Sequence, residues 1–258
     1  MRFEKWHAQG NSYLLVERDG ERRLDAARVR RLCDVATGIG SDGVVEVLAR
    51  SRTMKVVIWN PDGSNAEMSG NGTRIAAAWL LGQGHSPVEV ETGSRVVEAH
   101  SKGRTRGGVM LVEQQLGEVD VGADEELEVG GERLVVVAVS IGNPHAVVLR
   151  EGLTRADLLR LGPALERHPR FPARTNVQLV WPEARNRLRA LVWERGAGET
   201  ASSGSSATAA ASVAVARGWC ESPVRVAMPG GELTVSLAHG RATLTGPAER
   251  LCVGETEL

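Results

Sequence analysis

The chain contains an internal repeat, which constrains its fold more than any other feature of the sequence. Residues 59–78 align with residues 193–212 at a constant offset of 134 positions. This offset pairs Trp59 with Trp193 and Ser69 with Ser203. Each copy has the pattern of a strand, a Gly-containing loop, a Ser-Gly turn and an Ala-rich helix. A supersecondary unit that occurs twice predicts two similar halves.

A second match, at an offset of 132 residues, supports the same interpretation. Gly10-Asn11 aligns with Gly142-Asn143, and an apolar run follows shortly after each pair. Chance identity at small residues is the alternative, but the common order and nearly equal offset favour a duplicated domain. We therefore predict halves over residues 1–116 and 117–246. The Gly- and acid-rich stretch 117–124 would form their junction.

Composition excludes several classes of partner. The 258 residues are 42% apolar and 24% charged, as in an ordinary globular protein. With 31 basic and 32 acidic residues the net charge is −1, so nothing favours nucleic acid or an anionic membrane. No apolar run approaches the roughly 20 residues of a membrane helix, and no signal-peptide core follows Met1. Three cysteines without a CxxC pair indicate a reduced, cytoplasmic protein.

The periodicity predicts many short strands and few helices. Helical patterns cover residues 25–35, 73–81, 153–165 and 207–217. Strand patterns cover residues 12–17, 43–48, 54–59, 88–92, 134–139, 146–149, 177–180, 188–193, 224–228, 233–237 and 241–245. This balance predicts an α+β fold in which sheets or barrels enclose helices, and it argues against a doubly wound nucleotide-binding fold.

The two Ser-Gly turns are the candidate reactive positions. Each opens a helix, whose first N–H groups and positive dipole end suit an anion such as a carboxylate. If two such helix ends converge, Ser69 and Ser203 face one ligand from opposite sides. One side could remove a proton next to a carboxylate while the other returns it. Helix capping by each Ser is the simpler alternative, and both roles are compatible.

Six motifs, in order, resemble the diaminopimelate epimerase family over essentially the whole chain. The N-terminal segment 3–13 resembles F-x-K-x-H-G-x-G-N-D-F, and residues 38–43 resemble G-I-G-x-D-[GQ]. The repeat segment resembles N-x-D-G-S followed by C-G-N-G-x-R. Residues 142–145 match G-N-P-H, residues 168–177 resemble H-P-x-F-P-x-R-x-N-V, and residues 194–200 repeat E-R-G-A-G-E-T unchanged.

The departures from the family pattern fall on its reactive positions. The resemblance implies a catalytic cysteine where this chain has Ser69 and Ser203. A thiol at a helix N-terminus ionises near neutral pH, whereas a hydroxyl needs a neighbour to take its proton. His145, Glu194 and His7 are the candidate neighbours. Further changes from the family residues are Ala8, Ser12, Ser202, Ser206 and Thr208.

The resemblance also implies the remaining roles. The catalytic set would be Ser69, Ser203, His145 and Glu194. The substrate-binding set would be Asn11, Asn60, Gly70, Asn71, Asn143, Asn176, Glu194, Arg195, Gly204 and Ser205. The resemblance implies no cofactor and no metal, and the six histidines show no metal-ligand spacing. It further implies a homodimer, and two pseudo-symmetric domains that each wrap a β-barrel-like sheet around a central helix, with residues 247–258 returning to the first.

The expected function is cofactor-independent interconversion of LL- and meso-diaminopimelate by two-base α-proton transfer, a step toward lysine and peptidoglycan precursors. One alternative is another isomerase or dehydratase of the superfamily that acts on a different amino acid. A second is an amino-acid-binding protein without catalysis. The serines could be engineered, natural in an active branch, or natural in an inactive one. The retained Cys33, Cys220 and Cys252 and the additional departures favour natural divergence.

Overall fold

The computed structural model describes residues 1–18, 24–49, 53–66, 69–93 and 95–258. The chain forms two compact units. Unit 1 comprises Met1–Gln115 and Thr245–Leu258, and unit 2 comprises Leu116–Leu244. The boundary between the units falls within two strands, β7 (Met110–Glu118) and β16 (Arg241–Glu255). The predicted α+β fold is confirmed.

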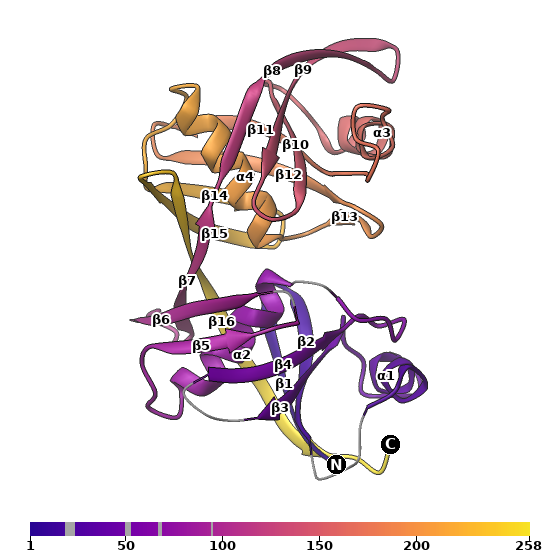
Figure 1. Cartoon of the computed structure of the whole chain (residues 1–258). Helices are drawn as coiled ribbons and strands as arrows, with labels where there is room; N and C mark the ends of the chain where they lie inside the picture. The colour runs from indigo at the N-terminus through magenta and orange to yellow at the C-terminus, as the bar shows by residue number, and fades with distance from the viewer. Residues whose placement is uncertain (19–23, 50–52, 67–68, 94) are drawn as a thin grey trace. The chain divides into compact units, whose positions relative to one another are not determined.

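Unit 1 is a closed barrel around a helix. Its elements are β1 (Arg2–Ala8), β2 (Asn11–Glu17), α1 (Ala26–Cys33), β3 (Val44–Ala49), β4 (Thr53–Trp59), α2 (Gly70–Leu81), β5 (Val88–Glu91), β6 (Val96–Arg104), β7 and β16. The strands follow the order β1-β2-β3-β4-β5-β6-β7-β16, and a β1–β16 pairing closes the ring. Helix α2 lies among these strands, whereas α1 lies outside them (Figure 1).

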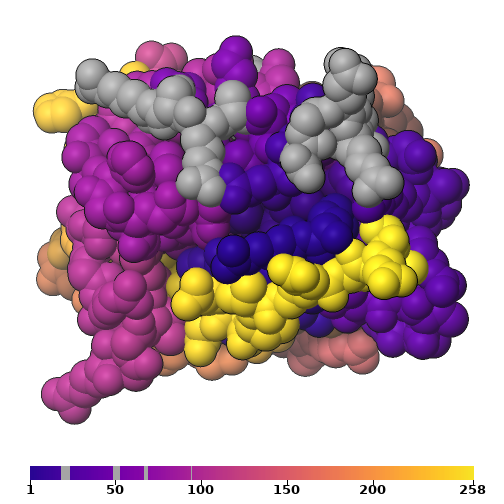
Figure 2. All heavy atoms as spheres, turned by 90° about the horizontal axis from the view of Figure 1, so that it is seen from below, coloured from indigo at the N-terminus to yellow at the C-terminus, as the bar shows by residue number. Residues whose placement is uncertain are grey.

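The C-terminal part of β16 completes the barrel of unit 1. It pairs antiparallel with β1, so that Phe3 lies opposite Gly254 and Lys5 opposite Cys252. Figure 2 shows this C-terminal segment in yellow beside the indigo N-terminal strand. A Cβ atom on Gly254 would lie 2.6 Å from the Phe3 ring, so the close approach of the two strands requires glycine here.

Unit 2 repeats this architecture around a second helix. Its elements are β8 (Asp120–Val129), β9 (Glu132–Ser140), β10 (Pro144–Leu149), α3 (Arg155–Glu166), β11 (Asn176–Ala184), β12 (Arg187–Glu194), β13 (Gly198–Thr200), α4 (Gly204–Ala216), β14 (Val224–Met228) and β15 (Gly231–Ala238). The strand order from β16 is β16-β15-β14-β12-β11-β10-β9-β8.

The two units share one pattern of strand pairing. In unit 1, β2–β3 and β4–β5 are parallel and β3–β4 and β5–β6 antiparallel. In unit 2, β10–β11 and β12–β14 are parallel and β11–β12 and β14–β15 antiparallel. In both units the first parallel connection passes through an outer helix and the second through the enclosed helix. The shared path supports the predicted duplication.

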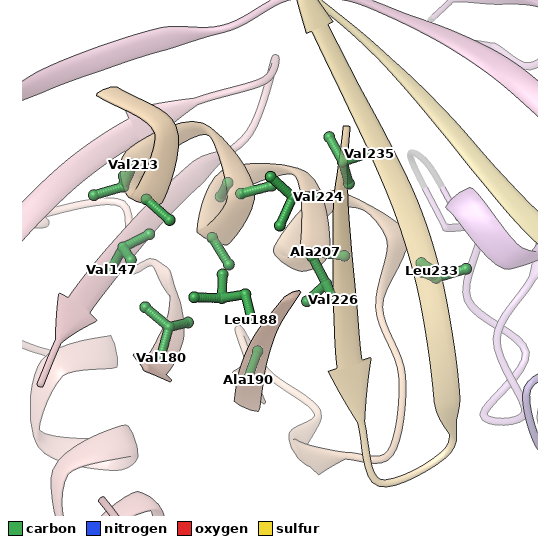
Figure 3. Close-up of a cluster of buried hydrophobic side chains, with 14 of the residues drawn as sticks. Val147, Val180, Leu188, Ala190, Ala207, Val213, Val224, Val226, Leu233 and Val235 are labelled. Carbon is green, nitrogen blue, oxygen red and sulfur yellow. The ribbon is translucent and has the colours of Figure 1, made fainter. Parts of the chain in front are cut away.

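Small side chains allow the enclosed helices to be surrounded by strands. Helix α4 has the sequence GSSATAAASVAVA, and almost all of it is buried. Figure 3 shows Ala207 and Val213 of this helix packed against Val147, Val180 and Leu188 of the sheet. Helix α2 is buried from Asn71 to Leu81 in the same way. A helix that is apolar on all faces is stable only inside such a ring.

The structure corrects two details of the sequence prediction. Helices α2 and α4 begin at Gly70 and Gly204, three residues earlier than expected, because the Gly- and Ser-rich segments that seemed to be turns form the first helical turn. Strands β1, β6, β7, β8 and β13 were not predicted. The expected junction at residues 117–124 begins just after the boundary at Gln115 and Leu116, and most of it belongs to β7 and β8. No helix in the described part of the chain is long and apolar enough to cross a membrane.

Gly162 in α3 should be intolerant of a side chain. A Cβ atom there would lie 2.8 Å from Cγ of Trp193, closer than van der Waals contact. We expect Gly162→Ala to lower the free energy of unfolding by ~1–2 kcal/mol, since overpacking outweighs the gain in helix propensity. Urea titration measures the change. A Cβ atom on Gly107 would lie 3.8 Å from its nearest neighbour, Thr105 Oγ1, which is ordinary contact. For Gly107→Ala we therefore expect the free energy of unfolding to change by no more than about 0.5 kcal/mol. Equal effects of the two variants would contradict this packing argument.

Candidate functional site

Ser69 caps the enclosed helix of unit 1. Its backbone is extended, and the helix begins at the next residue, Gly70. The Ser69 Oγ accepts a hydrogen bond of 3.0 Å from the Gly72 amide. The Thr73 amide donates to the Ser69 carbonyl at 2.9 Å. The amides of Gly70 and Asn71 precede these bonded groups at the helix end. Their position combines N–H donors with the positive end of the helix dipole, which favours a carboxylate.

Tyr13 contacts the same hydroxyl. Its Oη lies 3.0 Å from Ser69 Oγ, and either oxygen can donate. The sequence analysis did not select Tyr13. Two signals could have found it, since it is the only tyrosine of the chain and the family opening has Phe at this position.

A chain of hydrogen bonds fixes the orientation of two asparagines in unit 1. Arg74 Nη2 donates to Asn71 Oδ1 at 2.8 Å, and Asn71 Nδ2 donates to Asn11 Oδ1 at 3.1 Å. A guanidinium has no acceptor, so the direction of both bonds is settled. Asn11 therefore accepts through its oxygen and retains its amide N–H groups for other partners. Arg74 is fully buried and also donates to the Pro247 carbonyl.

Burial lowers the pKa of Arg74 to about 10, which still leaves it charged at neutral pH. Its Nη1 atom is buried without a partner in the described part of the molecule.

Asn60 has a local role. Its Nδ2 donates to Ser64 Oγ at 2.9 Å, and its backbone amide donates to the Ser64 carbonyl at 2.8 Å. These bonds close the turn after β4. The structure therefore brings Ser69, Gly70, Asn71 and Asn11 together in unit 1, while the Asn60 side chain is engaged by its own turn.

Ser203 caps the enclosed helix of unit 2 in the same manner. The Ala207 amide donates to its carbonyl at 3.0 Å, and the Ser206 amide approaches its Oγ at 3.4 Å. Glu194 is half-buried, and burial raises the pKa of its carboxyl. Hydrogen bonding with the Ser203 side chain opposes this rise, and because a carboxylate only accepts, the Ser203 hydroxyl is the donor. The carboxylate is therefore a stronger base than an exposed one.

His145 lies inside unit 2 with both ring nitrogens bonded. Nδ1 accepts from Gln178 Nε2 at 3.0 Å, so the proton resides on Nε2, which donates to Asn143 Oδ1 at 3.1 Å. Gln178 Nε2 also donates to Ser206 Oγ at 3.0 Å. Asn143 therefore accepts through its oxygen, as Asn11 does in unit 1. Burial lowers the pKa of His145 to about 3, so the ring is neutral near pH 7.

Asn176 and Glu166 fix the turn that follows Glu194. Asn176 donates from Nδ2 to the Pro144 carbonyl at 2.9 Å, and its Oδ1 accepts from the Arg195 amide at 3.0 Å. Glu166 accepts from the Gly196 amide at 3.0 Å and from Trp193 Nε1 at 2.8 Å. The Arg195 guanidinium is exposed and donates to the Ala173 carbonyl. Glu166 was also missed, because its contact to the turn is 30 residues distant in sequence.

The other candidates have ordinary surroundings. His7 Nδ1 accepts from the Gly10 amide, and its Nε2 lies 3.2 Å from Glu249 Oε2 on the neighbouring strand. Gly204 and Ser205 form the first turn of α4, as Gly70 and Asn71 do in α2. Among the residues that the structure describes, no group of three or more His, Cys, Asp or Glu side chains could hold a metal ion.

His145 should make stability sensitive to acid. Its pKa is about 3 when folded and about 6.5 when unfolded. Between these values the unfolded chain binds more protons, so stability falls as the pH falls through 6.5. At pH 5 this loss is about 2 kcal/mol relative to the neutral range. We expect His145→Gln to lose less stability between pH 7 and 5 than the unchanged protein, measured by urea titration. The exposed His85→Gln is the control, and a wild-type slope in both variants would refute the assignment.

The family described as diaminopimelate epimerase matches residues 3–120 and 137–251. Diaminopimelate epimerase of Pseudomonas fluorescens (strain Pf0-1) is 35% identical over 100% of this chain and 99% of its own length. Diaminopimelate epimerase 2 of Nostoc sp. is 34% identical over 99% of this chain and 95% of its own.

Solved structures share the fold at lower identity. A probable proline racemase from Agrobacterium radiobacter K84 superposes with a TM-score of 0.74 at 19% identity, covering 100% of this chain and 93% of its own. A hydroxyproline epimerase from Agrobacterium vitis gives 0.70 at 19% identity, covering 98% and 91%. A PhzF-family protein from Bacillus anthracis gives 0.74 at 15% identity, covering 100% and 99%.

Full-length identity of 34–35% to curated members, together with the family match over most of the chain, shows that this chain is an isomerase of the diaminopimelate epimerase family.

Proposed function

We propose that the chain interconverts LL- and meso-diaminopimelate by moving the α-proton between two bases, without a cofactor. The observation that carries this proposal is Ser203, the cap of α4, next to the half-buried carboxylate of Glu194, whose pKa burial raises and the Ser203 side chain lowers. Support for the substrate comes from the full-length identity to diaminopimelate epimerases, which exceeds the identity to the proline-type structures.

Unit 2 supplies one base position. As the α-hydrogen passes to Ser203 Oγ, the Ser203 proton moves to the Glu194 carboxylate along a hydrogen bond between the two groups. The charge thus stays on the carboxylate, and no free alkoxide forms. The desolvated Glu194 suits this role because a general base works best when its pKa lies closer to the working pH.

The helix ends stabilise the charge that develops on the substrate. The amides of Gly204 and Ser205 are preorganised donors for a carboxylate that gains electron density when the α-proton leaves. The amides of Gly70 and Asn71 have the same arrangement at the start of α2. Asn11 and Asn143 offer amide N–H groups to acceptor atoms of the ligand. Arg195 has the charge and geometry for the distal carboxylate of diaminopimelate. Asn176 positions Arg195, because its Oδ1 accepts a hydrogen bond from the Arg195 amide.

His145 has a positioning role in this proposal. Its neutral ring transmits the orientation set by Gln178 to Asn143, and a ring with a pKa of about 3 is a poor proton acceptor at neutral pH. Three expectations stay predictions: that His145 transfers a proton, that Asn60 binds the substrate, and that the chain forms a homodimer.

Glu194 should set the acid limb of the pH–rate profile. The base must be ionised, so activity falls as the pH drops through its raised pKa, above the ordinary value of about 4.3. We expect Glu194→Gln to reduce kcat by at least ~10²-fold and to remove that limb. Glu199→Gln, which breaks only an ion pair with Arg155, is the control. An unchanged acid limb in Glu194→Gln would show that another group is the base.

Exchange of the α-hydrogen in deuterated water tests the function. The protein is incubated with LL-diaminopimelate, and the α-hydrogen signal is followed by proton NMR beside a Ser69→Cys/Ser203→Cys variant. Deuterium uptake by the unchanged protein is the expected result. Uptake only in the variant would mean that the pocket is intact and the serines are inactive. Uptake in neither would refute the diaminopimelate assignment, and parallel samples with proline and trans-4-hydroxyproline would then test the other amino-acid substrates.

A further inference from the structure

The hydroxyl of Ser69 has three hydrogen-bonding positions, and the structure accounts for two. The Gly72 amide occupies one lone pair of Oγ at 3.0 Å, and Tyr13 Oη lies 3.0 Å away. If Tyr13 donates, the Ser69 proton is directed elsewhere and is available to a ligand. If Ser69 donates, its remaining lone pair is available to accept a proton. The pair therefore has two states, which correspond to the proton-delivering and the proton-accepting forms of a base.

The phenol ring has a fixed position. Tyr13 is buried in β2, with 6% of its surface exposed. A Cβ atom at Gly43 would lie 2.6 Å from Cε1 of the ring, so the glycine leaves the space that the ring occupies. Ser69 is in turn fixed as the cap of α2. The two oxygens are thus held together by elements that belong to the same unit.

Serine in this position needs such a partner. A helix N-terminus ionises a thiol but not an aliphatic hydroxyl. An unperturbed phenol has a pKa of about 10 and is a much stronger acid than an alcohol. The His145 ring is no substitute as a proton acceptor, since burial lowers its pKa to about 3.

From these contacts we infer that Tyr13 is a proton relay for Ser69, an inference that rests on the proposed function. When Ser69 delivers its proton to the substrate carbanion, the C–H bond forms, the Ser69 O–H bond breaks, and the Tyr13 proton moves to Ser69. The negative charge then resides on the phenolate. In the reverse direction the α-proton passes to Ser69 while the Ser69 proton returns to Tyr13. Ser69 is never a free alkoxide: the pair of each broken O–H bond stays on its oxygen, and the new C–H bond uses the electron pair of the carbanion.

A double-mutant cycle tests the relay. Tyr13→Phe keeps the ring and removes the hydroxyl, and Ser69→Cys supplies a group that ionises without help. We expect Tyr13→Phe alone to slow α-hydrogen exchange of one diaminopimelate stereoisomer by ~10²-fold, the lower end of general acid–base effects. In the Ser69→Cys background the same change should cost less than about 3-fold, because a thiolate does not need the relay. Equal losses in the two backgrounds, or no loss in either, would overturn the inference.

A second measurement needs no substrate. Tyr13 is the only tyrosine, so protein labelled with carbon-13 at tyrosine Cζ gives a single resonance. We expect the chemical shift of this resonance to titrate with pH while the protein stays folded. Ser69→Ala should move the midpoint of that titration to higher pH, because the phenolate loses a hydrogen-bond donor. Ser212→Ala removes a buried hydroxyl in unit 2 and should leave the midpoint unchanged. A resonance that does not titrate, or that ignores Ser69→Ala, would overturn the relay even if diaminopimelate proved to be the wrong substrate.

Discussion

The enclosure of α2 and α4 within the sheets of their own units is the constraint on which the rest of the structure depends. A helix that is buried on every side must be apolar on every side, which explains the Ala-rich sequence of α4 and, in α2, the run Ala76–Ala78 beside larger buried side chains such as Leu80. Apolar strands surround most of each enclosed helix. The polar groups that can contact a ligand therefore lie at its first turn, where the N–H groups lack partners within the helix. The capping serines, Ser69 and Ser203, stand at these ends. The repeat in the sequence thus places one hydroxyl at the start of each enclosed helix.

Hydrogen bonds that begin inside the core set the polarity of the side chains near these helix ends. In unit 1 Arg74 donates to Asn71, which donates to Asn11. In unit 2 Gln178 donates to His145, which donates to Asn143. Both paths end on an asparagine oxygen. Each asparagine therefore turns donor groups toward its remaining partners, as an anionic ligand requires. The intermediate residue differs in size and chemistry between the units, yet the direction of donation is the same.

The sequence predicted the features that local patterns encode. The repeat, the capping serines and the alternating strands identified the barrel-like sheets and the enclosed helices. Strands β6 and β8 escaped because their exposed residues are mostly polar, and β7 escaped because the buried Gln114 interrupts its apolar alternation. Tyr13, Gln178 and Glu166 escaped because their contacts to the site join residues that are far apart in sequence. The neutral state of His145 is likewise a consequence of burial, which no motif displays.

The two serines have chemically different partners, and this difference has a consequence for the reaction as proposed. In the proposed reaction Ser203 passes its proton to the Glu194 carboxylate, whereas Ser69 exchanges its proton with the Tyr13 phenol, whose oxygen lies 3.0 Å away. A thiolate pair would be nearly equivalent in the two directions. A carboxylate is predominantly ionised at neutral pH and a phenol predominantly protonated, even when burial raises the pKa of the carboxyl. In the proposed reaction the resting state of Ser203 is therefore prepared to accept the α-proton, and that of Ser69 to donate it. Each turnover leaves both partners in the opposite protonation state, so both must return by proton exchange before the next turnover in the same sense. The unlike partners thus set which protonation state each direction starts from, whereas the equilibrium between the stereoisomers is a property of the substrates alone.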